Sequence, residues 1–173
     1  MSSIILITGG ARSGKSRLAE RIVSSFGSPI GYLATCEARD AEMDQRIIRH
    51  RERRGAEWTT LEEPLRLTET LVAADGRFNA ILVDCITLWL SNLLLTHDDP
   101  VKVLTVVRDF AVSAPRLATP LILVTNEVGM GIVPENRLAR LFRDLAGEAN
   151  ELLAATADEV HLVVSGIPLK IKG

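Results

Sequence analysis

The sequence has few cysteines, few aromatic residues and no excess of either charge. Its 173 residues include two cysteines, 4% aromatic residues, and 20 Lys and Arg against 22 Asp and Glu, for a net charge of −2. Cys36 and Cys85 alone cannot form a disulfide framework or a zinc cluster, and their scarcity fits a reducing compartment. Because the charges balance, nothing attracts the chain as a whole to nucleic acid or to an anionic membrane. We therefore expect no nucleic-acid partner.

Long hydrophobic runs are also missing. The longest, at residues 4–7, 80–83, 121–124 and 162–164, fall far below the ~20 residues that span a bilayer. The apolar run near the N-terminus has no basic residues before it and no cleavage site after it, so we expect no signal peptide. We therefore expect no membrane insertion and a cytoplasmic location. With 47% apolar residues and no low-complexity tract, the chain is expected to fold as a single domain over residues 1–173.

Short apolar runs of strand length alternate along the chain with segments typical of helices. Continuous apolar runs indicate strands that are buried on both faces, as in parallel sheets with helices on either side. The alternation therefore predicts a three-layer α/β fold with a mostly parallel central sheet. The predicted strands cover residues 3–8, 30–34, 80–84, 121–125 and 161–165, and the predicted helices cover residues 16–25, 41–54, 91–95, 101–112 and 135–157.

A phosphate-binding motif follows the first predicted strand. Residues 9–16 read Gly-Gly-Ala-Arg-Ser-Gly-Lys-Ser, a full match to G-x-x-x-x-G-K-[ST], and a helix is predicted to follow at once. In such a loop, backbone N–H groups point at phosphate oxygens and the helix N-terminus adds partial positive charge. Lys15 should reach the outer phosphates and the Ser16 hydroxyl should bind Mg²⁺, which predicts a P-loop NTPase fold of the RecA-like type. The predicted nucleotide contacts are Gly9, Gly10, Ala11, Arg12, Ser13, Gly14, Lys15 and Ser16.

Asp84 ends the apolar run at residues 80–84. An acidic residue at that point emerges at the carboxyl edge of the sheet, where it can act as the second Mg²⁺ ligand. The alternative is that Asp84 caps the helix that follows, and the two roles can coexist.

The residues after Val124 narrow the class of nucleotide-binding protein. Small regulatory GTPases carry a base-reading N-K-x-D motif at the corresponding strand end, but this chain has Thr-Asn-Glu at residues 125–127. A motor protein or a large ATPase would need a longer chain. The classes that remain are a small-molecule kinase and a nucleotidyltransferase.

His50 lies among five arginines, in the segment Arg-Ile-Ile-Arg-His-Arg-Glu-Arg-Arg at residues 46–54. On a helix, positions 46, 49, 50 and 53 share one face. Neighbouring cations lower the pKa of a histidine and favour the neutral, nucleophilic imidazole, and arginines bind phosphates in bidentate fashion. A histidine that attacks the α-phosphorus of a nucleotide is one interpretation. The other is a solvated basic helix face with an incidental histidine.

Several segments together carry a resemblance to a known family. They are the phosphate loop at residues 9–16, Arg46-Ile47-x-x-His50, Trp58, and Thr-Asn-Glu-Val-Gly-Met-Gly-Ile-Val-Pro at residues 125–134, followed by matches at 137, 140, 142–144, 157–160 and 164–167. Over essentially the whole chain the sequence resembles the bifunctional adenosylcobinamide kinase/adenosylcobinamide-phosphate guanylyltransferase family. The segment at 125–134 is far more specific than the phosphate loop, which many families share.

This resemblance implies a two-step enzyme of cobalamin assembly that acts as a homotrimer. The first step phosphorylates the aminopropanol hydroxyl of adenosylcobinamide with ATP or GTP. In the second, GTP guanylylates a histidine, which maps onto His50, and releases pyrophosphate; the GMP then passes to adenosylcobinamide phosphate and gives adenosylcobinamide-GDP. A carboxylate at Glu62 can accept hydrogen bonds from guanine, although a solvated loop acid is the alternative. The further GTP contacts that the resemblance implies are Ala34, Thr35, Cys36, Arg51, Glu52, Arg53, Arg54, Glu62 and Asp84.

The chain departs from its relatives at two positions, and some roles stay open. Some relatives have adjacent histidines where this chain has Arg49 and His50, so it has one candidate nucleophile. Cys36 stands where a serine would also fit, and a thiol donates weaker hydrogen bonds. Asn126 and Glu127 either orient the corrinoid hydroxyl or a metal-bound water, or they are structural. A small-molecule kinase without the transferase step and a nucleotide-dependent binding module are the other functions left open.

Overall fold

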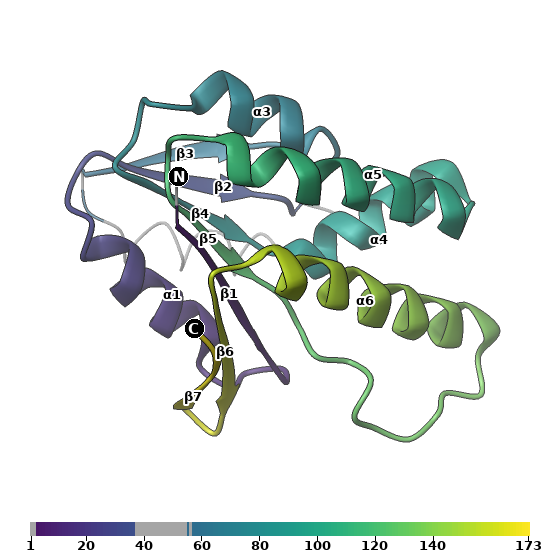
Figure 1. Ribbon diagram of the computed structural model, residues 1–173. Helices are drawn as coiled ribbons and strands as arrows, with labels where there is room; N and C mark the ends of the chain where they lie inside the picture. Colours follow the sequence, from purple (N-terminus) through teal and green to yellow (C-terminus); the bar gives the residue numbers. More distant parts are fainter. Residues whose placement is uncertain (1–2, 37–54, 56) are drawn as a thin grey trace.

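The computed structural model describes residues 3–36, 55 and 57–173, and in this part of the chain seven strands form one sheet in the order β3-β2-β4-β5-β1-β6-β7 (Figure 1). Every neighbouring pair is parallel except β6 and β7, which are antiparallel. The mostly parallel sheet predicted from the alternating pattern is therefore confirmed. The strands are β1 (Ile4–Gly9), β2 (Ile30–Ala34), β3 (Trp58–Glu62), β4 (Ala80–Asp84), β5 (Leu121–Val124), β6 (Glu159–Val164) and β7 (Ile167–Lys172).

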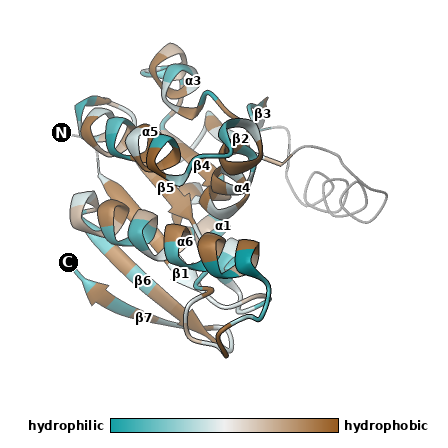
Figure 2. Ribbon diagram, turned by 90° about the vertical axis from the view of Figure 1, so that its right-hand side faces the viewer, coloured by the Kyte–Doolittle hydropathy of each residue, from teal (hydrophilic) through white to brown (hydrophobic). Residues whose placement is uncertain are grey.

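Helices cover both faces of the sheet. One face packs against α1 (Lys15–Ser24), and the other packs against α3 (Leu67–Ala74), α4 (Ile86–His97), α5 (Pro100–Ser113) and α6 (Arg137–Thr156), with the short 3-10 helix η1 (Ala114–Arg116) before β5 (Figure 1). Successive residues of a strand point to opposite faces. In β1, Ile5 and Ile7 therefore belong to the core under α1, whereas Ile4 and Leu6 belong to the larger core. Strands covered on both sides must be apolar at nearly every position, and the middle strands are predominantly hydrophobic (Figure 2).

The strands predicted from apolar runs are all present, with ends shifted by one or two residues at most. Sequence reasoning did not find β3 and β7. Half-buried β3 mixes polar and apolar residues, and β7 is exposed at every position and contains Pro168 beside two lysines. Both strands lie at the edges of the sheet. An edge strand does not have to be apolar on both faces, so no continuous apolar run marks it.

The helices predicted at residues 16–25, 101–112 and 135–157 appear as α1, α5 and α6. The helix predicted at 91–95 is the second half of the longer α4, which is buried on several sides and so lacks a one-sided pattern. Helix α3 was not predicted, and the helix predicted at 41–54 lies outside the described residues. Within the described residues, no helix has the length and apolar character needed to cross a membrane.

Asp75 joins the end of α3 to the segment that enters β5. Its carboxylate accepts hydrogen bonds from the backbone N–H groups of Ala118 (3.0 Å) and Thr119 (2.9 Å) and from the Thr119 hydroxyl (2.8 Å). The Thr119 hydroxyl oxygen accepts in turn from the N–H of Gly76 at 2.8 Å. Partial burial by itself raises the pKa of Asp75, but these hydrogen bonds together outweigh it and lower the pKa below its usual value.

We expect Asp75→Ala to lower the free energy of unfolding by about 1–3 kcal/mol at pH 7, because three donors lose a charged acceptor. The lowered pKa means that this stabilisation is fully present above the unfolded-state value of about 3.9 and is lost as the pH falls through the folded-state value. In urea titrations, the difference between wild type and variant should therefore stay constant from pH 7 to about pH 5 and shrink as the pH falls further toward pH 3. The exposed Asp109 of α5 provides the control, with an expected change of less than about 0.5 kcal/mol for Asp109→Ala. A difference that stays constant with pH would contradict this account.

Candidate nucleotide-binding site

The predicted phosphate loop connects the end of β1 to the start of α1. Three of its residues have positive φ angles, Gly9 at 148°, Arg12 at 55° and Gly14 at 100°. A side chain at position 9 would collide with the backbone carbonyl of Val163 in the neighbouring strand β6. Gly14 is the N-cap residue of α1, so the free N–H groups of the first helical turn open into the loop. The strand, loop and helix therefore have the arrangement that binds phosphate in P-loop proteins.

Lys15 lies across the loop. Its ammonium donates a hydrogen bond to the backbone carbonyl of Gly10 at 2.6 Å, and its side chain is only 7% exposed. Burial lowers the pKa of Lys15, and the charge of nearby Asp84 acts in the opposite direction. The Lys15 ammonium can therefore give up its hydrogen bond to the Gly10 carbonyl and bind a phosphate oxygen in its place.

The first turn of α1 brings Ser16 next to Asp84 at the end of β4. The Ser16 hydroxyl donates to the Asp84 carboxylate at 3.4 Å, and the Tyr32 hydroxyl donates to the same carboxylate oxygen, also at 3.4 Å. The N-cap residue of α4 is Cys85 rather than Asp84, so the helix-cap alternative for Asp84 is wrong. Mg²⁺ prefers hydroxyl and carboxylate oxygens as ligands. The Ser16 and Asp84 side chains therefore fit a magnesium ion beside the loop. The described residues contain no group of three or more His, Cys, Asp or Glu side chains that could hold a metal by themselves.

The register of the sheet lines up the other predicted contacts at the same edge. Glu62 of β3 is level with Ala34 of β2, and Ala34 is level with Asp84 of β4. Asp84 is level with Val124 of β5, which is level with Ile7 of β1. The structure thus brings Ala34, Glu62 and Asp84 to one edge. Four strand spacings of about 4.8 Å separate β3 from β1, which places Glu62 roughly 19 Å across the sheet from the loop strand. At that distance Glu62 lies well away from the loop strand.

Thr35, one of the predicted GTP contacts, is fully buried. Its hydroxyl donates to the Cys85 carbonyl at 2.7 Å and accepts from the Cys85 N–H at 2.9 Å, so it joins the end of β2 to the start of α4. Burial raises the pKa of the Cys85 thiol to about 12, which excludes a reactive thiolate there. The side chain of Thr35 therefore holds the edge together, while Cys36 beside it is half-buried.

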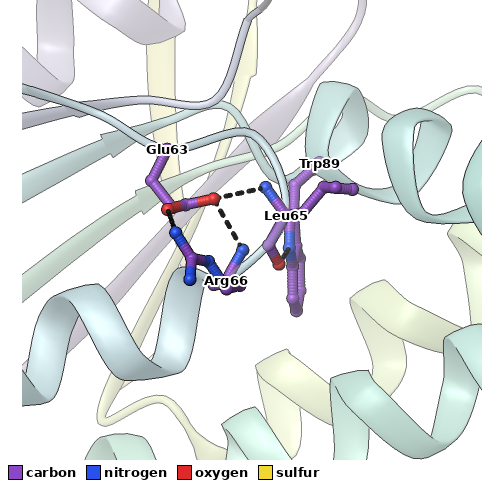
Figure 3. A network of polar contacts seen from close by, with 4 residues as sticks. All are labelled: Glu63, Leu65, Arg66 and Trp89. Carbon is purple, nitrogen blue, oxygen red and sulfur yellow. Dashed lines mark hydrogen bonds and ion pairs between the residues drawn. The ribbon is translucent and has the colours of Figure 1, made fainter.

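Sequence reasoning missed the residues that fix the turn after Glu62. The Glu63 carboxylate accepts from the N–H groups of Leu65 (3.0 Å) and Arg66 (2.9 Å) and forms an ion pair with the Arg66 guanidinium at 3.6 Å (Figure 3). The Trp89 indole of α4 donates to the Leu65 carbonyl at 2.8 Å. The signal in the sequence is the acid that precedes Pro64, but only the fold shows which backbone groups it meets.

His50, Arg51, Glu52, Arg53 and Arg54 lie outside the described residues. Their roles therefore stay predictions.

The fold and the loop define a P-loop nucleotide-binding protein. Solved structures with the same fold include the flagellar accessory protein FlaH of Methanocaldococcus jannaschii, with a TM-score of 0.53 at 13% identity over 98% of this chain and 78% of that one. The P4 protein of bacteriophage phi6, solved in complex with ADP, also has a TM-score of 0.53, at 14% identity over 97% of this chain and 54% of that one. At such identities the likeness shows the fold alone. The P-loop NTPase fold predicted from the sequence is confirmed.

Within that class, residues 5–171 match the family model described as cobinamide kinase / cobinamide phosphate guanyltransferase, and the chain belongs to this family. It is similar to the bifunctional adenosylcobalamin biosynthesis protein CobU of Salmonella typhimurium, with 47% identity over 98% of this chain and 99% of that protein. It is also similar to the bifunctional adenosylcobalamin biosynthesis protein CobP of Pseudomonas aeruginosa, with 46% identity over 97% of this chain and 96% of that protein. The family resemblance stated from the sequence is therefore confirmed.

We expect Lys15→Met to lower kcat/KM for nucleotide use by about 100-fold or more, because the transferred phosphoryl group loses a cation that stabilises its developing charge. The variant should be no less stable to heat than the wild type, since it removes a buried charge whose desolvation is costly. Steady-state rates of corrinoid phosphorylation at varied nucleotide concentration and a thermal melt measure the two effects. Lys102→Met, at an exposed position of α5, is the matched control and should change neither. Unchanged nucleotide use in Lys15→Met would refute the role of the loop.

Proposed function

We propose that this protein phosphorylates adenosylcobinamide and then transfers GMP to the product, giving adenosylcobinamide-GDP. The observation that carries the proposal is the match of residues 5–171 to the kinase and guanyltransferase family. The phosphate loop and Asp84 at one edge of the sheet support it, because both steps cleave a nucleoside triphosphate.

In the kinase step, the hydroxyl oxygen of the acceptor attacks the γ-phosphorus of ATP or GTP. The bond between the γ-phosphorus and the bridging oxygen breaks, the nucleoside diphosphate leaves, and the hydroxyl proton passes to solvent or to a nearby base. The loop N–H groups and Lys15 neutralise charge on the phosphates. Ser16 and Asp84 would hold Mg²⁺, which neutralises further phosphate charge when it is bound.

In the transferase step, an imidazole nitrogen of His50 attacks the α-phosphorus of GTP. The bond between the α-phosphorus and the oxygen that bridges it to the β-phosphate breaks, and pyrophosphate leaves. A phosphate oxygen of adenosylcobinamide phosphate then attacks the same phosphorus, and the bond to His50 breaks. The four residues after His50 include three arginines, Arg51, Arg53 and Arg54, which suit the charge of a triphosphate.

The remaining predicted GTP contacts lie at the ends of strands β2 and β3. Ala34 ends β2 beside Glu62, which ends β3 and is exposed, and Thr35 and Cys36 follow Ala34 directly. The Glu62 carboxylate can accept hydrogen bonds from N1–H and the N2 amine of guanine, which would favour GTP over ATP. This assignment agrees with the distance of Glu62 from the loop strand.

A labelling experiment tests the transferase step. We expect wild-type protein incubated with Mg²⁺ and GTP to take up covalent label from the α-phosphate but not from the γ-phosphate. The label should be acid-labile and base-stable, and adenosylcobinamide phosphate should remove it. His50→Ala should take up no label and should keep at least part of the kinase activity, since a different group is attacked in that step.

The control variant is His97→Ala, which changes an exposed histidine at the end of α4 and should be labelled like the wild type. Label that persists in His50→Ala would refute the covalent mechanism. Wild-type protein that phosphorylates the corrinoid but takes up no label would be a kinase only. Tight GTP binding without transfer to any corrinoid would indicate a binding module.

We also infer a homotrimer of single-domain subunits that works in the cytoplasm. The family resemblance suggests the trimer, and exposed apolar side chains support an association of subunits. Met130 is 81% exposed and Ile132 is 96% exposed, and edge strand β7 presents Ile167, Leu169 and Ile171 to solvent. Apolar surface of this kind is typical of protein interfaces.

Light scattering should therefore give a mass about three times the 18.9 kDa of the chain. Ile132→Asp should reduce that mass, whereas Val72→Asp, at an exposed valine of α3, should not. A wild-type mass equal to one chain would refute the trimer.

A further inference from the structure

Strand β5 ends between the two strands that carry the phosphate site. It pairs with β1, which leads into the loop, and with β4, which ends in Asp84. The Thr125 N–H donates to the Ile7 carbonyl at 2.9 Å, and the Glu127 N–H donates to the Gly9 carbonyl at 3.0 Å. The segment 125–127 therefore leaves the sheet in direct contact with the first residue of the loop.

The backbone of Asn126 is held on both sides by side chains from two helices. Its N–H donates to the hydroxyl of Thr87 in α4 at 2.7 Å, and its carbonyl accepts from the side-chain amide of Asn150 in α6 at 3.1 Å. Thr125, which is 1% exposed, connects the two helices. Its hydroxyl donates to the Asn150 side-chain oxygen at 2.7 Å and lies 3.3 Å from the Thr87 hydroxyl.

This network ties the start of a long loop to two helices. Residues 125–136 contain no helix or strand, and they form the long loop between β5 and α6 (Figure 1). Two more side chains of α6 hold the same loop, since Arg143 donates to the Gly129 carbonyl at 3.0 Å and Arg140 donates to the Pro134 carbonyl at 2.9 Å. Positions 140, 143 and 150 share one face of the helix.

The network leaves the side chain of Asn126 available. Asn126 is half-buried, and within the described residues its carboxamide makes no hydrogen bond, although its backbone makes two. Glu127 is also half-buried and accepts from the N–H of Gly129. Both residues lie beyond the end of β5, between Gly9 and Asp84, where the transferred phosphoryl group would lie.

We propose that Thr87, Thr125 and Asn150 are positioning residues of the phosphoryl-transfer step, which hold the Asn126–Glu127 segment beside the reacting phosphate. The inference rests on the proposed kinase activity. Catalytic groups must be held to within about 0.5 Å of their working position. A hydrogen-bond network that is largely buried and anchored in two helices can hold these residues in place, whereas a loop without such contacts cannot.

The test compares the same substitution at the two ends of β5. Thr125→Val removes the hydroxyl at the carboxyl end, whereas Thr119→Val removes the hydroxyl that bonds to Asp75 and Gly76 at the amino end. Each leaves a polar partner unsatisfied, so both should lower the melting temperature. We expect only Thr125→Val to lower kcat for phosphorylation of adenosylcobinamide, by about 10- to 100-fold, because a misplacement near 1 Å costs that much. Its dissociation constant for the nucleotide should stay within about twofold of wild type, since the loop and Lys15 are intact.

Three further variants sharpen the test. Thr125→Ser keeps the hydroxyl and should restore most of kcat. Asn150→Asp keeps the acceptor for Thr125 but loses the donor to the Asn126 carbonyl, and it should lower kcat in the same way. The double variant Thr125→Val/Asn150→Asp should be scarcely slower than either single variant, because residues of one network are not additive.

Equal losses of kcat in Thr125→Val and Thr119→Val would overturn the proposal, because they would reflect general loosening of the fold. A loss that appears in nucleotide affinity instead of kcat would also overturn it, as would full kcat in Thr125→Val. Failure of the proposed function is distinguishable, since wild-type protein would then phosphorylate no corrinoid, and the assignment of positioning residues would fall with it.

Discussion

The shared register of the parallel strands is the constraint on which the site depends. Ile7, Val124, Asp84, Ala34 and Glu62 are level with one another, so five strands end at one edge of the sheet. A shift of one residue in any strand would exchange its side chains between the two differently packed cores and would move its terminal residue off this edge. The burial of both faces, which makes the strands apolar, is therefore also what aligns the phosphate loop with Asp84 and Glu62. Core packing and site geometry are set by the same contacts.

Helix α4 joins this edge to the loops around it. It starts directly after Cys85, the residue next to Asp84, and it carries polar side chains in an otherwise apolar core. Thr87 accepts from the Asn126 backbone, and Trp89 donates to the loop before α3. Asn92, only 5% exposed, donates to the carbonyls of Thr35 (2.8 Å) and Pro64 (3.1 Å). Buried polar groups are costly unless they are paired, so each of these side chains ties a particular loop to the helix. One helix thus fixes the surroundings of the ends of β2, β3 and β5.

How much the sequence predicts depends on how local each feature is. The phosphate loop was predicted in detail, because its glycines, lysine and serine act through the backbone of one short segment. The central strands were predicted because burial on both faces requires continuous apolar runs, whereas β3 and β7 at the edges carry no such run. Asp84 was left with two interpretations, and the structure decided against the cap because α4 starts from Cys85. Thr35 was predicted only as a nucleotide contact, and its buried bonds to Cys85 could not be foreseen, since residues 35 and 85 meet only through strand pairing.

By itself, the sequence determined the α/β fold class, the position of the phosphate loop and the family of this protein. The apolar periodicity, the G-x-x-x-x-G-K-S spacing and the segment at 125–134 are all local patterns in the sequence. Tertiary structure alone decided the order of the strands, the contact between Ser16 and Asp84, and the network of Thr87, Thr125 and Asn150. Those contacts join residues that are 25 to 68 positions apart, and no local pattern records them. They exist because the strands must pair in one register and the helices must bury one face, and these conditions are met only when the whole chain packs.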